Sequence, residues 1–286
     1  MAPAAVLDVR RLLRFTGYRS AQVGLIGIGL ILLVALVGPS VAPHGPSEIV
    51  ALPFDDPSSK ALLGTDFLGR DVLSRVLSGG RMLLALGVAA TAIAYVLGVG
   101  IGLAAGYSRS LIDPVLMRSI DVLLGVPAIL VLLIVLTGAG RNPAALVVAV
   151  AITQVPWIAR LVRVAALETS TRGYVEAAVA RGEGTPAVLR REIFPNILNI
   201  ILTDAGIRFT RSILLIASVN FLGVALQPPA ADWALMISEN RVGLDIQPWA
   251  AAVPAALIAI LTISVNLVVD GIAYSLGISD VRPVGR

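Results

Sequence analysis

Residues 83–106 read LLALGVAATAIAYVLGVGIGLAAG and contain no charged side chain. About 20 consecutive apolar residues are enough for a helix to cross the hydrocarbon core of a bilayer. A helix that is apolar all round must be buried on every side, either in a large protein core or in lipid. This stretch therefore predicts a membrane-spanning helix, and it sets the fold class of the chain.

Five further apolar stretches have the length of a span: 22–42, 119–138, 143–165, 197–223 and 251–276. The first ends in Ser40-Val41-Ala42, which is typical of a signal-peptide cleavage site. Its apolar run is about twice as long as that of a signal peptide, so we expect a retained anchor. The predicted fold is all-α, a polytopic membrane protein with six transmembrane helices.

Composition excludes several classes of protein. The 286 residues are 57% hydrophobic and 14% charged, whereas soluble domains are about 45–50% apolar and about 25% charged. No cysteine is present, which excludes disulfide frameworks and cysteine nucleophiles, and the single histidine, His44, excludes two-histidine metal sites. No glycine-rich nucleotide motif occurs, so the chain is not expected to hydrolyse ATP. The net charge of +4 is interpreted as loop bias and not as a nucleic-acid footprint.

The basic residues predict the orientation of the spans. Of the 22, 14 lie on one side, in the terminal segments, in the loops 107–118 and 166–196, and at the adjoining end of the fourth span (Arg160 and Arg163). Six lie in the opposite loops, and Arg208 and Arg211 fall inside the fifth span. Because cytoplasmic loops carry an excess of Lys and Arg, both termini are predicted to be cytoplasmic. The expected organisation is an N-terminal tail, first span and external loop (1–82), a transmembrane core (83–276) and a cytoplasmic C-terminal tail (277–286).

The predicted cytoplasmic loop 166–196 carries the most informative motif. Residues 172–196 read RGYVEAAVARGEGTPAVLRREIFPN. The alanine-rich part favours a helix that ends at Gly182, and Thr185 with Pro186 favours the start of a second one. The loop is therefore predicted to be a short helix–turn–helix, with small residues that allow a partner to approach closely.

This loop resembles the EAA loop of ABC-importer permeases, because Glu176-Ala177-Ala178 is followed by Gly182 and Pro195 at the family's spacing. The resemblance implies a coupling helix that docks in a groove of an ATPase subunit. The residues implied for that role are Tyr174, Glu176, Ala177, Ala178, Arg181 and Gly182. An ordinary interfacial amphipathic helix is the alternative interpretation.

The resemblance extends to most of the chain and narrows to the C-type permease of dipeptide, oligopeptide and nickel importers. It rests on Leu63–Arg75, Gly106-Tyr107, Asp121-Val122, Trp157, Pro248-Trp249 and Asp270-Gly271. The chain departs from the family pattern at Glu192 and Phe194, and at Ile216, where an acidic residue often precedes Ser-Phe-Leu-Gly.

Such a resemblance implies a type I ABC-importer permease fold in the bacterial inner membrane. The implied partners are a different B-type permease, two cytosolic ATPase subunits that bind ATP and magnesium, and a periplasmic or lipid-anchored substrate-binding protein. No cofactor is implied for this chain itself. Peptides, nickel chelates and other small solutes all remain open as cargo.

Six charged residues outside the spans, together with one tryptophan, are candidates for docking the binding protein. They are Asp66, Arg70, Asp71, Arg75, Trp233, Glu239 and Arg241. Asp66–Arg70 and Asp71–Arg75 are each four residues apart, so the alternative is that these pairs only fold the external loop.

Polar residues inside the spans are candidates for the translocation path, because ionisable side chains in a span seldom face lipid. They are Asp204, Arg208, Arg211, Asn220, Asn266 and Asp270. A self-contained Asp204–Arg208 pair, or helix packing through the stripe that Asn266 and Asp270 form with Thr262, are the alternatives. An ion-coupled secondary transporter would also need charges at the midplane, and this cluster is its only support.

Glycines in the second span predict close packing of helices. Gly98, Gly102 and Gly106 are spaced four residues apart, which is the pattern that lets two membrane helices approach closely.

Overall fold

A computed structural model describes residues 14–108 and 111–277, and throughout these ranges the regular structure is helical. The all-α class is therefore confirmed. The elements are η1 (Arg14–Gly17), α2 (Arg19–Val41), α3 (Val72–Tyr107), α4 (Ile112–Leu124), α5 (Ala128–Ala139), α6 (Pro143–Ser170), α7 (Gly173–Ala180), α8 (Thr185–Val188), the π-helical η2 (Leu189–Ile193), α9 (Phe194–Phe221), α10 (Trp233–Asn240), η3 (Arg241–Gly243) and α11 (Trp249–Ser275).

Within these described ranges, four helices are long and apolar enough to cross a membrane, namely α2, α3, α6 and α11. The stretch 119–138, predicted as one span, is instead divided between α4 and α5, which are bent by 89° relative to each other. The break falls between Leu124 and Ala128, where Gly125 and Pro127 stand. Proline disfavours helical backbone in the residue before it, which explains the bend. As one broken span the pair brings the count to five.

Helix α9 is not among the apolar spans, although it has 28 residues. Every 18-residue window of this helix contains Asp204, Arg208 and Arg211, because the three lie near its middle. The predicted fifth span is therefore a long helix whose centre is charged, and the count of six spans stays a prediction.

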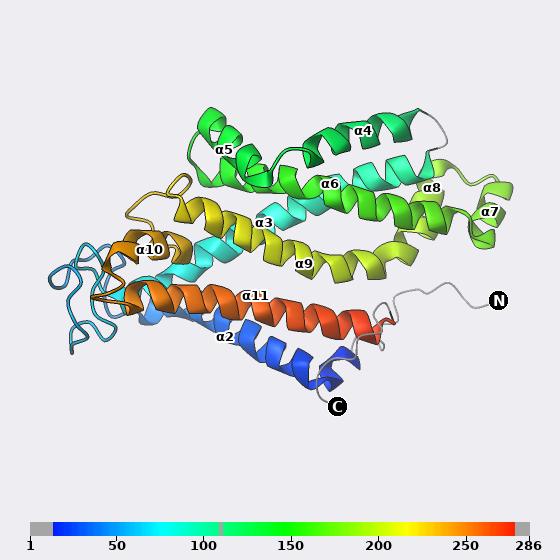
Figure 1. Cartoon of the computed structure of the whole chain (residues 1–286). Coiled ribbons are helices and arrows are strands. Elements are labelled where there is room, and N and C mark those ends of the chain that lie inside the picture. Colours follow the sequence, from blue (N-terminus) through cyan, green and yellow to red (C-terminus); the bar gives the residue numbers. More distant parts are fainter. Residues whose placement is uncertain (1–13, 109–110, 278–286) are drawn as a thin grey trace.

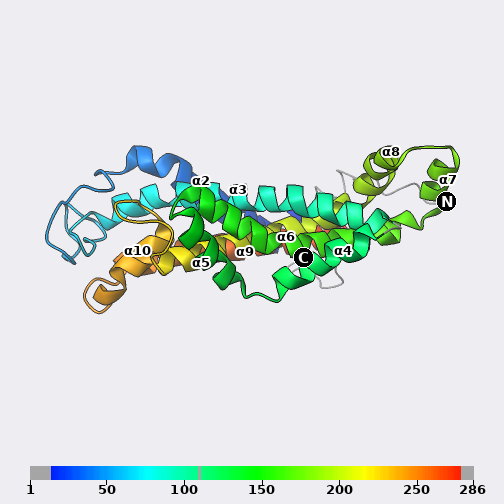
Figure 2. The ribbon, with the colours of Figure 1, turned by 90° about the horizontal axis from the view of Figure 1, so that it is seen from above.

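The helices form an elongated bundle with two different ends (Figures 1 and 2). Helices α7 and α8 lie at one end, where α2 begins and α11 ends (Figure 1). The segment 42–71 and α10 lie at the opposite end (Figure 1). The segment predicted to be an external loop is shorter than 43–82, because α3 begins at Val72. The Asp71 side chain accepts hydrogen bonds there from the backbone N–H groups of Leu73 and Ser74. Helix α3 thus runs across the boundary expected at residue 82.

Helices α3 and α6 pack closely through the glycine stripe. A Cβ atom on Gly102 would lie 2.6 Å from Val162 Cβ and 2.7 Å from the Ala159 carbonyl oxygen. Gly98 and Gly106 meet the same helix, at Ile158 and at the Arg163 carbonyl. The predicted close-packing role is confirmed, since a larger side chain at any of these positions would push the two helices apart.

Replacing Gly102 with leucine is expected to destabilise the bundle by about 1–3 kcal/mol, because overpacking forces backbone shifts. Gly100→Leu is the matched control, since nothing lies within 4 Å of a Cβ atom placed there. Thermal unfolding of the two variants in detergent provides the measurement. Equal melting temperatures of the two variants would show that widening the α3–α6 contact does not lower the stability of the bundle.

Candidate functional site

Helix α7 has one face turned inward and one turned outward. Val175 and Ala178 are buried and pack with Val188 and Ile193 of the following segment. The outward face is exposed and consists of Glu176, Ala177, Val179, Ala180 and, just after the helix, Arg181 and Gly182. The predicted helix–turn–helix is present, but Ala178 lies inside it and not on the surface that a partner can touch.

The EAA segment ends in a glycine for a conformational reason. Gly182 has φ +85°, a left-handed conformation that costs other residues about 1–2 kcal/mol. Its N–H donates to the Val179 carbonyl at 2.9 Å, and the Glu183 N–H donates to the Ala178 carbonyl at 3.2 Å. These two bonds form a Schellman motif that closes the C-terminus of α7. Arg181 pairs with Glu183 at 2.7 Å on the exposed side of this turn.

Tyr174, the first of the candidate coupling residues, lies partly buried beside the same cluster. Burial raises the pKa of its hydroxyl above the ordinary value, so the side chain stays neutral at physiological pH. Tyr174 therefore anchors α7 to the bundle with an uncharged ring.

Four of the external candidates form one buried charge cluster, which we call the external cluster and which consists of Asp66, Arg70, Arg75 and Glu239. Arg70 lies 2.7 Å from Asp66 and 3.1 Å from Glu239, and Arg75 lies 3.3 Å from Asp66 and 2.8 Å from Glu239. None of these side chains is more than 6% exposed. Two arginines and two acids balance each other, so the cluster ties the external loop to α10.

Of the two side-chain pairs that the spacing predicted in this region, one is formed. The Asp66–Arg70 pair is present, but the expected side-chain pair between Asp71 and Arg75 is not formed. Asp71 caps α3 instead, and Arg75 also donates to the Pro46 carbonyl. Burial raises the pKa of Glu239 above its ordinary value, although the two nearby arginines act in the opposite direction.

Trp233 and Arg241 have opposite environments. Trp233 is fully buried, donates from its indole N–H to the Val76 carbonyl at 2.8 Å and packs against Gly79 and Gly80. Arg241 is exposed. Of the seven external candidates, Arg241 alone has an exposed side chain, because the side chains of the other six are buried within the described part of the chain.

Asn220 is buried and holds the loop between α9 and α10. Its amide donates to Asp232 Oδ1 at 3.1 Å, and its oxygen accepts from the Leu226 N–H at 3.4 Å. Asp232 was not among the residues predicted from the sequence, although an Asp directly before an apolar helix is a common N-cap signal. Burial raises the pKa of Asp232, whose Oδ1 caps α10 through the N–H groups of Ala234 and Leu235. Asn220 thus faces the interior of the chain.

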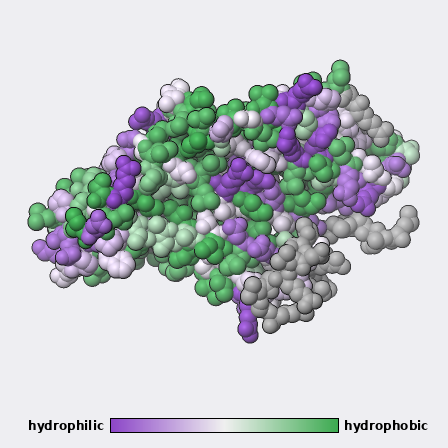
Figure 3. Space-filling model, in the orientation of Figure 1, coloured by the Kyte–Doolittle hydropathy of each residue, from purple (hydrophilic) through white to green (hydrophobic). Residues whose placement is uncertain are grey.

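The charges of α9 lie together and contact α3 and α6. Arg208 pairs with Asp204 at 3.0 Å, and the Tyr95 hydroxyl donates to Asp204 at 2.7 Å. Arg211 lies over the Trp157 ring, 5.0 Å from its centroid. Hydrophilic side chains gather near the middle of the face seen in Figure 3, over α6 and α9. The predicted Asp204–Arg208 pair is therefore present, with Tyr95 and Trp157 as neighbours that the spacing did not reveal.

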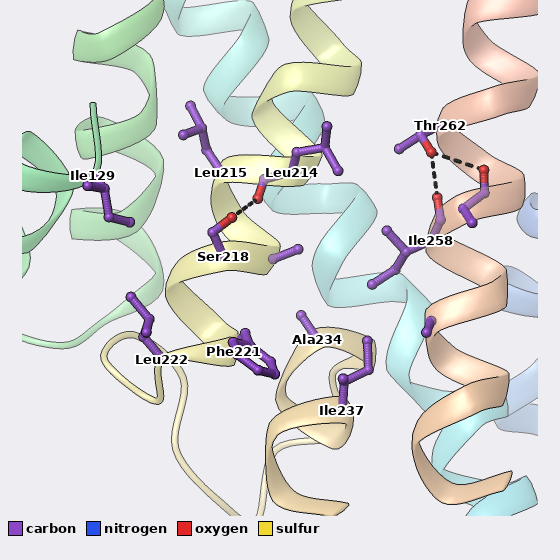
Figure 4. A pocket seen from close by; sticks show the side chains of 13 residues that line it. Ile129, Leu214, Leu215, Ser218, Phe221, Leu222, Ala234, Ile237, Ile258 and Thr262 are labelled. Carbon is purple, nitrogen blue, oxygen red and sulfur yellow. Dashed lines mark hydrogen bonds between the residues drawn. The ribbon is translucent and has the colours of Figure 1, made fainter. Parts of the chain in front are cut away.

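A second feature of the bundle is an apolar hollow of about 780 Å³ lined by α5, α9, α10 and α11 (Figure 4). Leu214, Phe221 and Ile258 line its walls, and Thr262 stands on its α11 side. Along the same stripe of α11, Asn266 and Asp270 are exposed. In the hydrogen bonds found, Thr262 and Asn266 bond only to carbonyls of their own helix. Within residues 14–108 and 111–277, these two side chains therefore do not join α11 to a neighbouring helix through a hydrogen bond.

Comparison with known proteins identifies the family. Residues 98–277 match the family described as binding-protein-dependent transport system inner membrane component, and residues 8–61 match the N-terminal transmembrane domain of oligopeptide transport permease C. A di/tripeptide transport system permease protein of Pseudomonas aeruginosa is 32% identical over 269 residues, which cover 92% of this chain and 89% of the relative. A glutathione transport system permease protein of Pectobacterium atrosepticum is 37% identical over 222 residues, which cover 78% of this chain and 74% of that protein.

The fold is also found among solved structures. An amino acid ABC transporter, crystallised with histidines, has a chain that superposes with a TM-score of 0.52 and 24% identity, covering 66% of this chain and 88% of its own. The spans, the fold and the family matches together define a multi-pass membrane protein. The chain belongs to the family of inner-membrane components of binding-protein-dependent transport systems.

Proposed function

We propose that this chain is one permease subunit of an ATP-driven ABC importer that carries di- or oligopeptides, or similar small solutes, across the bacterial inner membrane into the cytoplasm. A different permease subunit completes the pathway, two ATPase subunits hydrolyse ATP, and a substrate-binding protein delivers the cargo from outside. The relatives that carry peptides and glutathione support this class of cargo. Nickel chelates and other non-peptide solutes are the second candidate.

The exposed face of α7 is the observation that carries the proposal. Glu176, Ala177 and Val179 are unpaired with the rest of the described chain in the contacts found, and the helix lies at one end of the bundle. Small and apolar side chains on an exposed helix suit insertion into a groove of another protein. When the ATPase pair closes, a helix held in such a groove moves with it and transmits the motion through η2 and α9.

The face with the hollow and the α11 stripe suits the second permease subunit. The exposed Asn266 and Asp270, which lie along the same stripe of α11 as the apolar hollow of about 780 Å³, would be costly to leave against lipid. A second subunit placed here encloses a path lined partly by this chain. Arg241 remains the exposed candidate for contact with the binding protein.

Purification of the tagged chain from its native membrane tests the proposal. We expect a second, different permease and two ATPase subunits to copurify. Reconstituted vesicles supplied with the binding protein should then take up a labelled dipeptide only when ATP is present on the side of the membrane that carries the ATPase subunits. Uptake by this chain alone, without ATP, would instead favour an ion-coupled transporter.

A further inference from the structure

A small cavity lies at the break between α4 and α5, separate from the apolar hollow. Its volume is about 200 Å³, several times the roughly 30 Å³ that one water occupies in the liquid. Pro127 and Ala128 of the α5 start, Thr153 and Trp157 of α6, and Arg211 of α9 all contribute to its lining. It therefore brings together three segments that are far apart in the sequence.

The charges around this cavity do not balance. Arg208 is neutralised by Asp204, at 3.0 Å. Arg211 has no ion pair among those found in residues 14–108 and 111–277, and its contact is with the Trp157 ring. A cation held among apolar side chains within a span is costly unless an anion accompanies it. The Asp204, Arg208 and Arg211 group thus carries one positive charge that calls for a counter-ion.

The start of α5 adds to this preference for an anion. Pro127 is the N-cap residue of this 12-residue helix, and Pro127 and Ala128 line the cavity. The N-terminus of a helix carries a partial positive charge and free N–H groups. The guanidinium of Arg211 is a planar donor whose geometry matches that of a carboxylate. Both features of the cavity therefore favour the same kind of ligand.

We propose that Arg211, together with the N-terminus of α5, forms a carboxylate-binding site for the solute in transit. The inference rests on the proposed function as a peptide permease, since every unmodified peptide carries a C-terminal carboxylate. The bend between α4 and α5 creates the site, because a straight helix over 112–139 would leave no helix N-terminus beside Arg211. The guanidinium lies over the face of the Trp157 ring, which helps to hold it in place.

Cysteine labelling tests the site directly, since the chain has no cysteine of its own. Thr153→Cys places a thiol in the lining, and Ser47→Cys, in the exposed external loop, reports the intrinsic reactivity of each reagent. In the intact importer, each thiol is labelled with the anionic sulfonatoethyl thiosulfonate and with the cationic trimethylammonioethyl reagent. We expect the ratio of the anionic to the cationic labelling rate to be about tenfold higher at position 153 than at position 47. Adding Arg211→Gln should remove this preference. A dipeptide should protect the thiol, and its C-terminal amide should not.

Two results would overturn the proposal. One is a wrong labelling pattern at position 153. This means that the thiol shows no anion preference, that the dipeptide does not protect it, or that it does not react while position 47 does. The other is a preference that disappears when phosphatidylglycerol is added to phosphatidylcholine vesicles, because the occupant would then be a lipid headgroup.

Uptake measurements separate this inference from the proposed function. In the reconstituted importer, Arg211→Gln is expected to lower dipeptide uptake by about tenfold or more, while Arg211→Lys retains part of it. Arg160→Gln is the matched control, because Arg160 is an exposed arginine of α6 that pairs with Asp121. If the unaltered importer moves no peptide, the proposed function fails. If it moves peptide and Arg211→Gln does so equally well with the same subunits assembled, only the carboxylate site is wrong.

Discussion

Replacing Glu239 with alanine is expected to lower the free energy of unfolding by about 3–5 kcal/mol, because it leaves a buried arginine without a counter-charge. Glu239 is 6% exposed and its Oε2 accepts from both Arg70 and Arg75. Without it, the two arginines share only Asp66. The external loop would separate from α10, since the cluster joins residues that are 169 positions apart. Thermal unfolding of the purified variant in detergent measures the loss.

A second substitution distinguishes loss of charge balance from simple loss of contacts. In Glu239→Ala combined with Arg70→Leu, the remaining Asp66 and Arg75 again balance each other at 3.3 Å. We expect the double variant to be more stable than Glu239→Ala alone. Asp245→Ala, at an exposed acid near α10, is the control and should change the stability by less than about 0.5 kcal/mol. Additive losses in the double variant would contradict the charge-balance explanation.

Spacing along the sequence predicted only the contact in this cluster between residues that are close in sequence. The i, i+4 spacing identified Asp66–Arg70 correctly, and it misled at Asp71, because that residue precedes α3 and caps it. No pattern in the sequence brings Glu239 to these arginines, since the contact depends on how α10 packs against α3. The same limit applies to Asn220, whose position before a loop gave no sign of its bond to Asp232.

The fold was predictable wherever apolar length and glycine spacing decide it. Helices α2, α6 and α11 lie close to the expected ranges, and the α3–α6 contact follows the Gly98, Gly102 and Gly106 stripe. The stretch 119–138 is not one continuous helix, because hydropathy is insensitive to Pro127, which stands at the N-terminus of α5 just after the end of α4. The candidate site at α9 was located by its charges, whereas Tyr95 and Trp157 belong to other helices and needed the tertiary structure.

The coupling segment shows why burial must be known before a test is chosen. A bulky residue at Ala178 would overpack the cluster with Val188 and Ile193, and Gly182 cannot accept a side chain without backbone strain. Both changes would damage the loop itself, so loss of transport in either would say little about contact with an ATPase. A residue on the exposed face is the better choice.

Val179 is that residue, because it is apolar and 51% exposed at the tip of α7. Val179→Asp is expected to leave the isolated chain folded, at a cost of about 0.3–1 kcal/mol from a negative charge near a helix C-terminus. Docked in an apolar groove, the unpaired carboxylate would cost several kcal/mol more. We therefore expect at least about a tenfold loss of copurifying ATPase and a parallel loss of ATP-driven uptake.

Val242→Asp is the matched control for this prediction, since it makes the same change at an exposed valine in η3, at the opposite end of the bundle. It should leave ATPase recovery unchanged, because α10 and η3 lie far from α7 along the bundle (Figure 1). Equal recovery of ATPase with both variants would mean that α7 is not the docking helix. A loss confined to Val179→Asp would assign the contact to its exposed face, because the buried face formed by Val175 and Ala178 is the same in both proteins.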